Sequence, residues 1–174
     1  HLIGAIRVNQ SFDVPLMDIN QDLMPKWQEN LKRISDIIFA SLVLIIGMPI
    51  FLLIGLVIKL PSKGPILFRQ ERIGKDGLPF NIVKFRSMYI DAEKQGPALS
   101  KTGDTRITTF GNFLRKSRID EFPQFYNVLI GDMSLVGPRP ERQFYIDQIV
   151  QLAPHYKHLN KVRPGITSLG QVKY

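Results

Sequence analysis

The chain of 174 residues is long enough for one domain with a buried core, whereas two full domains would be cramped. It contains no cysteine, which excludes a disulfide framework and a zinc site built from thiolates. The 23 Lys and Arg residues outnumber the 15 Asp and Glu residues and give a net charge of +8. This charge favours an anionic partner, such as nucleic acid, a phospholipid surface or a phosphate-rich substrate, and does not choose among the three.

Residues 1–29 are mixed in character and show few periodic patterns, so we interpret them as a linker and the remnant of a preceding domain. The first residue is His rather than Met, and no cleavable signal precedes the first apolar block. We therefore expect this sequence to be part of a longer protein.

Residues 30–61 contain an apolar block, of which residues 37–58 carry no charge. A run of about 20 such residues is long enough to cross the hydrocarbon core of a bilayer. Pro49 lies in the middle of the run, where its missing N–H group and its ring bend or break a helix. Lys32 and Lys59 flank the run on both sides, which favours a cytoplasmic location for both ends. Two interpretations stay open: a re-entrant helix that breaks at the proline and returns, and a kinked helix that spans the membrane.

Residues 62–174 have the pattern of a small globular domain. Two strands joined through Asp76-Gly77 predict a short β-hairpin. Residues 105–117 place apolar side chains at helical spacing, which predicts a short amphipathic helix. Further helices are expected over residues 120–129 and over residues 142–159, the latter interrupted or ended by a proline. The expected fold class is therefore α/β and mostly helical.

Two groups of cations are candidates for binding phosphate. Lys84 and Arg86 share one face of the second predicted strand, where they could form a phosphate cradle. A solvated strand edge protected by lysine is the simpler interpretation of that pair taken alone. Arg139 stands between Pro138 and Pro140, which restrict the loop and would hold the guanidinium group ready for an oxyanion.

Two adjacent acids, Asp120 and Glu121, follow a basic cluster. Neighbouring positions on a helix do not face each other, so these acids are not expected to share a proton. One carboxylate could attack an electrophile while the other holds a divalent cation, and Arg115 and Arg118 would keep both acids ionised. The alternative is structural: Asp120 would cap a helix whose first turn favours acidic residues. Without further context the capping interpretation is the stronger one.

His155 and His158 stand three positions apart, a spacing compatible with metal binding. No carboxylate completes a familiar ligand pattern beside them. We therefore expect a surface or membrane-facing role for this pair.

The order of these motifs along the chain is more specific than any one of them. After the apolar block with its central proline come "FRQERIG", "KFRSM", "LRKSRIDEFPQFYNVLIGDMSLVGPRP" and "RPGIT". This order resembles the bacterial sugar transferase family, the monotopic polyprenyl-phosphate phosphoglycosyl transferases. The resemblance implies a re-entrant membrane helix-break-helix over residues 30–61. It also implies a small cytoplasmic catalytic domain over residues 62–174, with a shortened C-terminal part, at the bacterial inner membrane.

The resemblance also implies a reaction: transfer of a sugar 1-phosphate from a UDP-sugar to undecaprenyl phosphate, with release of UMP. Such a transfer is the first membrane step in the synthesis of an exopolysaccharide, capsule or O-antigen-type glycan. Asp120 matches the family's nucleophile, which forms an aspartyl phosphosugar intermediate, and Glu121 matches the ligand of Mg²⁺. Three further positions match active-site cations, namely Lys84, Arg115 and Arg139. The implied partners are the two substrates and membrane phospholipids, without nucleic acid, and a homo-oligomer is compatible with the pattern.

The sequence departs from the family pattern at Met48, where many members have serine before the proline, and at Ser168, where glycine is typical. Two other classes of protein share parts of the pattern. A basic nucleic-acid-binding module on a membrane tether would need a recognition helix or an aromatic and basic face, and the sequence shows neither. A non-catalytic membrane scaffold of a polysaccharide assembly complex is supported by the apolar block alone.

Overall fold

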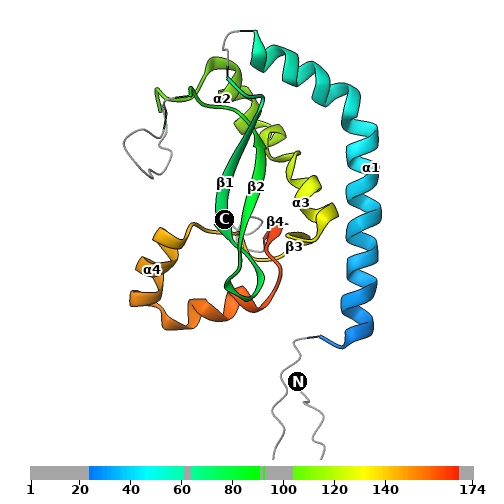
Figure 1. The fold of residues 1–174 in the computed structure, drawn as a ribbon, viewed down its shortest axis with the longest axis vertical. Coiled ribbons are helices and arrows are strands. Elements are labelled where there is room, and N and C mark those ends of the chain that lie inside the picture. The colour runs from blue at the N-terminus through cyan, green and yellow to red at the C-terminus, as the bar shows by residue number, and fades with distance from the viewer. Residues whose placement is uncertain (1–23, 61–63, 91, 93–103, 169–174) are drawn as a thin grey trace, which may run out of the picture. The chain divides into compact units, whose positions relative to one another are not determined.

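The computed structural model describes residues 24–60, 64–90, 92 and 104–168 (Figure 1). The backbone forms two compact units, residues 1–34 and 35–174. Of the described residues, the first unit contributes only the start of the first helix, and the architecture below belongs to the second. Most of the predicted N-terminal linker lies outside the described residues.

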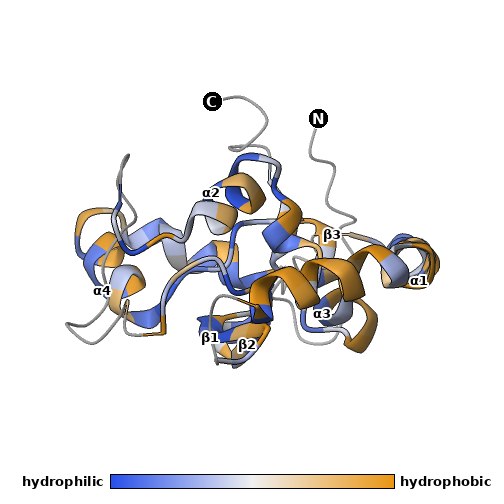
Figure 2. Ribbon diagram, turned by 90° about the horizontal axis from the view of Figure 1, so that it is seen from above, coloured by the Kyte–Doolittle hydropathy of each residue, from blue (hydrophilic) through white to orange (hydrophobic). Residues whose placement is uncertain are grey.

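The apolar block forms one long helix, α1 (Lys26–Lys59), whose 34 residues correspond to a length of about 51 Å. Pro49 lies inside this helix, and Figure 1 shows that α1 bends rather than running straight. Figure 2 shows its apolar composition, and Ile45 and Leu52 are each 70% exposed. α1 is therefore long and apolar enough to cross a membrane and is compatible with membrane association. The sequence predicted a bend or a break in this helix, and the structure shows a bend. The re-entrant path of the helix through a membrane remains a prediction.

The predicted hairpin is confirmed. Strands β1 (Leu67–Ile73) and β2 (Pro79–Phe85) pair in antiparallel fashion and are joined by the short 3-10 turn η1 (Lys75–Gly77). Asp76 and Gly77 adopt left-handed backbone angles, with φ of 57° and 78°. Aspartate tolerates this region better than most residues and glycine adopts it freely, which explains why this dipeptide makes the turn.

The predicted short helices are also present, with small shifts of their ends. The first begins where the Thr108 hydroxyl accepts a hydrogen bond from the N–H of Gly111 at 2.9 Å. The expected helix over residues 120–129 is split, and the last helix ends before Pro154, where a 3-10 segment begins. The elements are α2 (Thr109–Lys116), η2 (Ile119–Glu121), α3 (Gln124–Ile130), α4 (Gln143–Leu152) and η3 (Pro154–Lys161).

A second pair of strands was not predicted. β3 (Ser134–Val136) and β4 (Gly165–Thr167) are parallel and only three residues long, too short for an alternating pattern to stand out. Gly137 and Gly165 pack so closely that a Cβ atom on Gly165 would lie 2.1 Å from the Gly137 nitrogen. We call residues 138–140 the arginine loop, because Arg139 stands there between two prolines. The strand pair β3–β4 holds the base of this loop.

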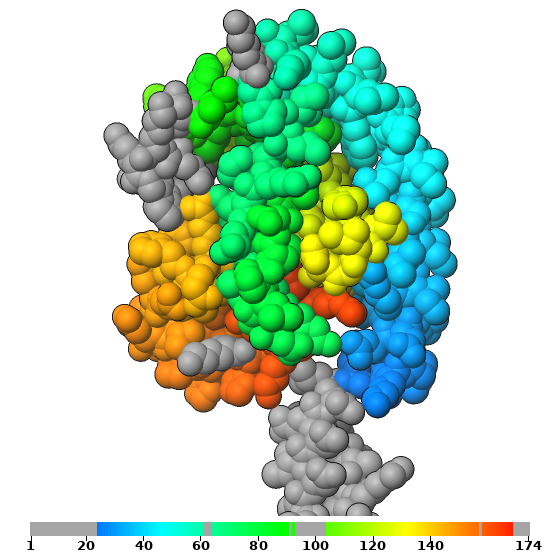
Figure 3. Space-filling view, viewed as in Figure 1, coloured from blue at the N-terminus to red at the C-terminus, as the bar shows by residue number. Residues whose placement is uncertain are grey.

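The core consists of two apolar clusters, and α1 contributes to both. Figure 3 shows the atoms of α3 lying against those of α1, and the rings of Phe39 and Phe125 are 6.1 Å apart. Along α2, Leu114 is buried in the core, as the amphipathic pattern predicts, whereas the apolar Phe113 of the same pattern is 59% exposed. The buried members are Ala40, Ile82, Val128 and Met133 in one cluster and Ile54, Ile58, Phe85 and Leu114 in the other.

A buried carboxylate ties α1 to the second strand pair. Asp36 is 4% exposed although it begins an apolar stretch. Its Oδ2 accepts a hydrogen bond from the Ser134 hydroxyl at 2.7 Å, and its Oδ1 accepts one from the Leu135 N–H at 3.3 Å. These bonds offset the cost of burying the acid, because each carboxylate oxygen has a donor.

Asn127 of α3 binds the backbone of β2. Its Oδ1 accepts a hydrogen bond from the Val83 N–H at 3.0 Å, and its Nδ2 donates to the Asn81 carbonyl oxygen at 2.8 Å. Asn127 is 1% exposed, so its removal would leave buried backbone groups without partners. We expect Asn127→Leu to lower the free energy of unfolding by about 2–4 kcal/mol, as measured by urea unfolding in a membrane mimetic.

The matched control is Asn112→Leu, since Asn112 is exposed on α2. Its free energy of unfolding should change by no more than about 0.5 kcal/mol. Equal effects of the two substitutions would show that Asn127 does not brace β2.

Candidate functional site

The two adjacent acids lie in the short turn η2, between α2 and α3. Arg118 precedes this turn with a left-handed backbone angle, φ of 59°, and so redirects the chain after α2. Helix α3 begins after Pro123, whose side chain makes no capping hydrogen bond, and Asp120 caps neither helix. The capping interpretation is therefore wrong, and another reason is needed for an Asp120 side chain that is 8% exposed.

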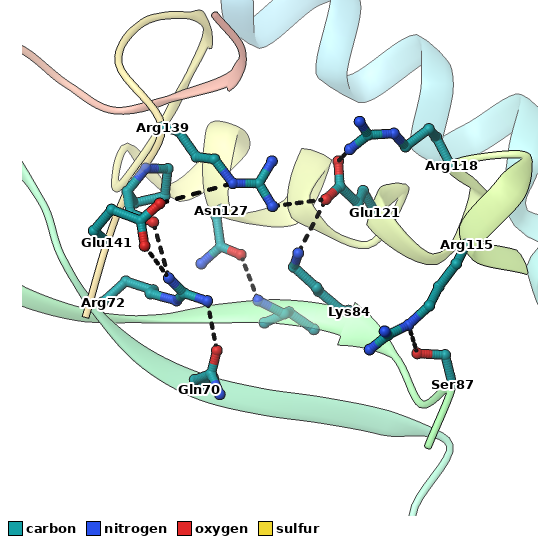
Figure 4. A network of polar contacts seen from close by, with 12 residues as sticks. Gln70, Arg72, Lys84, Ser87, Arg115, Arg118, Glu121, Asn127, Arg139 and Glu141 are labelled. Atoms are coloured by element: carbon teal, nitrogen blue, oxygen red, sulfur yellow. Dashed lines mark hydrogen bonds and ion pairs between the residues drawn. The ribbon is translucent and has the colours of Figure 1, made fainter. Parts of the chain in front are cut away.

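Three cations from different segments surround the Glu121 carboxylate (Figure 4). Lys84 Nζ of β2 lies 3.0 Å from Oε1, and Arg139 Nη2 of the arginine loop lies 3.6 Å from the same oxygen. Arg118 Nη1 lies 3.6 Å from Oε2. The fold thus brings together Lys84, Glu121 and Arg139, which are far apart in the sequence.

These cations keep Glu121 ionised. Burial alone would raise the pKa of the Glu121 carboxyl, but Lys84, Arg139 and Arg118 together outweigh burial and lower it. Burial lowers the pKa of the Lys84 ammonium group, and Glu121 opposes that effect. The pair is therefore a tight contact between opposite charges with little solvent around it.

Asp120 has a different electrostatic environment from its neighbour. Burial raises the pKa of the Asp120 carboxyl; Lys84 lowers it, Glu121 raises it, and Arg115 and Arg118 lower it by smaller amounts. Within the described residues, no hydrogen bond or ion pair engages the Asp120 carboxylate. One acid is thus held in ion pairs, while the other keeps its oxygens available for a reaction.

The two remaining predicted cations, Arg115 and Arg86, make other contacts. Arg115 Nε donates a hydrogen bond to the Ser87 hydroxyl at 2.8 Å, and its charge acts on Asp120. Arg86 is buried, and its Nη2 donates to the carbonyl oxygen of Ile58 at 3.3 Å, in the last turn of α1. A positive charge at this place stabilises the helix, because it interacts favourably with the carbonyl groups at the C-terminal end. The two residues of the predicted phosphate cradle therefore make different contacts. Lys84 forms an ion pair with Glu121, whereas Arg86 binds the last turn of α1.

Sequence reasoning missed two residues next to this cluster. Glu141 Oε1 lies 4.0 Å from Arg139 Nε, and Arg72 of β1 forms an ion pair with Glu141 at 3.0 Å. The one indication of Glu141 in the sequence was its position directly after the arginine loop.

The described residues contain no group of three or more side chains suited to hold a metal ion. His155 and His158 are exposed, and their rings stack with centroids 6.2 Å apart. Mg²⁺, however, commonly uses one or two carboxylates and completes its shell with substrate phosphates and water. Glu121 Oε2 faces Arg118 at 3.6 Å, and the Arg118 side chain is 62% exposed, so the two carboxylates of Glu121 and Asp120 fit such a site.

A cavity of about 610 Å³ lies apart from the acids, beside the hairpin turn. Its lining includes Asp76, Asp147 and Lys161 and none of the predicted site residues. The acids lie instead where buried and exposed residues meet: Asp120 is 8% exposed, whereas the Arg139 side chain is 42% exposed.

Comparisons with known proteins show which sequences this chain is similar to. The family model of the bacterial sugar transferases matches residues 27–174. One relative is a UDP-N-acetylgalactosamine-undecaprenyl-phosphate N-acetylgalactosaminephosphotransferase of Aeromonas hydrophila. It is 46% identical over 82% of this chain and 34% of the relative.

This chain covers different shares of two other relatives. A UDP-glucose:undecaprenyl-phosphate glucose-1-phosphate transferase of Escherichia coli (strain K12) is 42% identical over 98% of this chain and 35% of the relative. A putative undecaprenyl-phosphate N-acetylgalactosaminyl 1-phosphate transferase of Bacillus subtilis (strain 168) is 45% identical over 72% of this chain and 70% of the relative. The chain thus spans about a third of the length of the Aeromonas and Escherichia relatives. Since the family model covers most of the chain, the protein belongs to the bacterial sugar transferase family.

Proposed function

We propose that this chain is the catalytic region of an enzyme that transfers a sugar 1-phosphate from a UDP-sugar to undecaprenyl phosphate and releases UMP. The family supports the class of reaction, and the relatives are named for an undecaprenyl-phosphate acceptor. Their names differ in the sugar, so the donor sugar of this chain is left open.

The observation that carries the proposal is the contrast between the two acids. The Asp120 carboxylate is buried and makes no ion pair within the described residues, whereas Glu121 is surrounded by three cations. In the first step, an Asp120 oxygen attacks the phosphorus that bears the sugar, and the bond from this phosphorus to the UMP oxygen breaks. UMP leaves with the bonding electrons, and the phosphosugar stays on Asp120.

In the second step, a phosphate oxygen of undecaprenyl phosphate attacks the same phosphorus. The bond to Asp120 breaks, which regenerates the carboxylate and forms undecaprenyl diphosphate sugar. Phosphoryl transfer depends mainly on alignment and charge stabilisation. Lys84, Arg115 and Arg139 would stabilise the charge that develops on the phosphate oxygens in both steps.

Glu121 would bind Mg²⁺, with Asp120 and the donor's phosphates nearby. When bound, the ion would offset the negative charge of the donor's diphosphate and of the departing UMP. Glu121 fits this role because its neighbouring cations favour the ionised carboxylate and one of its oxygens faces an exposed arginine.

The membrane location follows from α1. We propose that its bend is the turn of a re-entrant hairpin, so that residues 30–61 dip into the bacterial inner membrane from the cytoplasmic face. The site would then lie at the level of the lipid phosphates, which suits a lipid acceptor, and phospholipids would contact the exposed side chains of α1. The reaction would begin the synthesis of a surface glycan such as an exopolysaccharide.

We expect the rate of UMP release to fall as the pH drops through the pKa of Asp120, because only the carboxylate can attack. Burial raises that pKa, so the fall should occur at a higher pH than an exposed aspartate would give. Arg118 is one of the cations that lower the pKa of Asp120, so Arg118→Gln should move the fall to a still higher pH. Single-turnover pH profiles measure this shift.

The exposed Lys116 on α2 supplies a control, since Lys116→Gln should leave the profile in place. A profile of Arg118→Gln that is unchanged, or is moved to lower pH, would show that the acidic limb does not report Asp120.

The test of the function is UMP release from a panel of UDP-sugars by the longest natural chain that contains these residues. The protein would be placed in lipid nanodiscs with undecaprenyl phosphate and Mg²⁺, and the product would be identified by mass spectrometry. Release that requires the lipid and one sugar, and stops with EDTA, is the expected result. Failure with every UDP-sugar would overturn the proposed donor class.

A further inference from the structure

An ion pair on strand β1 holds the end of the arginine loop. Arg72 Nη1 donates to Glu141 Oε2 at 3.0 Å and to the carbonyl oxygen of Pro140 at 3.2 Å. The backbone holds the same segment, since the Ile73 N–H donates to the Glu141 carbonyl oxygen at 2.9 Å. Arg72 therefore binds both the last residue of the arginine loop and the acid that follows it.

Arg139 lies between two acids, as Figure 4 shows. Its Nη2 is 3.6 Å from Glu121 Oε1, and its Nε is 4.0 Å from Glu141 Oε1. Both distances exceed the roughly 2.7–2.9 Å of a charge-assisted hydrogen bond between guanidinium and carboxylate. Arg139 is thus directed toward the acids without being bound tightly by either, and its side chain is 42% exposed.

Glu141 is the acid that could bind Arg139 more tightly. The two residues are separated by a single proline, and both Glu141 oxygens lie within 4.0 Å of a guanidinium group. Arg72 holds Glu141 at the shorter distance, 3.0 Å, and the Arg72 side chain is the less exposed of the two arginines. Arg72 therefore supplies most of the charge that neutralises Glu141.

We infer that Arg72 is a positioning residue that neutralises Glu141 and so keeps Arg139 available for the phosphate oxygens of the nucleotide-sugar donor. This inference rests on the proposed function, in which Arg139 meets those oxygens. Without Arg72, Glu141 would accept a two-pronged hydrogen bond from Arg139, because carboxylate and guanidinium match in geometry. Arg139 would then be withdrawn from Glu121 and from the donor.

Compensation between two substitutions tests the inference. Arg72→Gln should lower kcat/KM for the UDP-sugar by about 10- to 100-fold, the effect of losing one charged hydrogen bond. Glu141→Gln should change it by less than about threefold, because its amide does not capture Arg139. In the double variant, kcat/KM should recover to within a few-fold of the wild-type value. Such a non-additive result is expected when two residues act through the same contact.

Controls separate this role from folding. Arg69→Gln changes an exposed arginine on the same strand and should leave kcat/KM unchanged. Arg72→Lys keeps a positive charge next to Glu141 but loses the hydrogen bond from Nη1 to the Pro140 carbonyl oxygen, and it should keep most of the activity. Thermal unfolding of each variant shows which of them are folded.

Three results would overturn the inference: a folded double variant as weak as Arg72→Gln, a folded Arg72→Lys variant equally weak, or a Glu141→Gln variant with a large defect of its own. Affinity for UDP, measured by calorimetry on the same proteins, gives a readout that needs no turnover. It should weaken in Arg72→Gln and recover in the double variant. If the wild type releases no UMP, the proposed function fails, whereas the pattern of UDP affinities still decides the role of Arg72.

Discussion

Asp120→Asn is expected to reduce UMP release by a factor on the order of 10⁴ or more, because an amide cannot replace the attacking carboxylate. Asparagine has nearly the same shape, and a neutral side chain is less costly to bury than an acid at this site. The variant should therefore fold and bind the membrane as the wild type does. Initial rates with the sugar that the wild type uses, together with thermal unfolding, measure both effects.

The covalent intermediate gives a second measurement of the same substitution. Wild-type protein incubated with a UDP-sugar labelled in the sugar, without lipid acceptor, should retain label after acid quenching, and Asp120→Asn should not. Asp147→Asn is the control, since Asp147 is exposed on α4, and it should behave as the wild type. Label that stays on the Asp120→Asn protein would assign the nucleophile to another residue.

Glu121→Gln should reduce kcat by about 100-fold or more, because the site loses the carboxylate proposed to bind Mg²⁺ and the charge that balances its cations. The Mg²⁺ concentration for half-maximal rate should rise. Lys84 would be left nearly buried without its partner at 3.0 Å, which is expected to lower the free energy of unfolding by about 3 kcal/mol. Rates over a Mg²⁺ series and urea unfolding measure these effects.

The control is Glu71→Gln, which removes an exposed acid from strand β1 and should alter neither the rate nor the Mg²⁺ dependence. If Glu121→Gln lowered the rate while the Mg²⁺ dependence stayed the same, Glu121 would act through its ion pairs rather than through the metal.

Local elements were predictable because their causes are local. Asp76-Gly77 makes the hairpin turn through its own backbone angles, and the Thr108 cap and apolar spacing define α2. The pair β3–β4 was missed because its strands are three residues long and their paired residues, such as Ser134 and Gly165, lie far apart in the sequence. Its stability depends on the close approach of Gly137 and Gly165, which no periodic pattern records.

Most residues of the candidate site could be named from the sequence, but the contacts between them could not. Each cation near Glu121 comes from a different segment, and only the fold shows that Lys84 lies 3.0 Å from it. Strand periodicity placed Arg86 beside Lys84, but β2 ends at Phe85, so the Arg86 side chain follows a different course toward α1. Arg72 was missed because an arginine on a strand has no distinguishing pattern.

The bonds between Asp36 and strand β3 bear on whether this protein could be shortened. Membrane anchors are often exchangeable modules, which can be cut off or replaced by another apolar helix. Here α1 supplies an acceptor for the buried Ser134 hydroxyl, and it contributes Ala40 to one core cluster and Ile54 and Ile58 to the other. A version that lacks α1 would expose those apolar surfaces and remove the hydrogen bonds that Asp36 accepts from strand β3. The helix is therefore a structural part of the folded domain, and a shortened protein has to retain it.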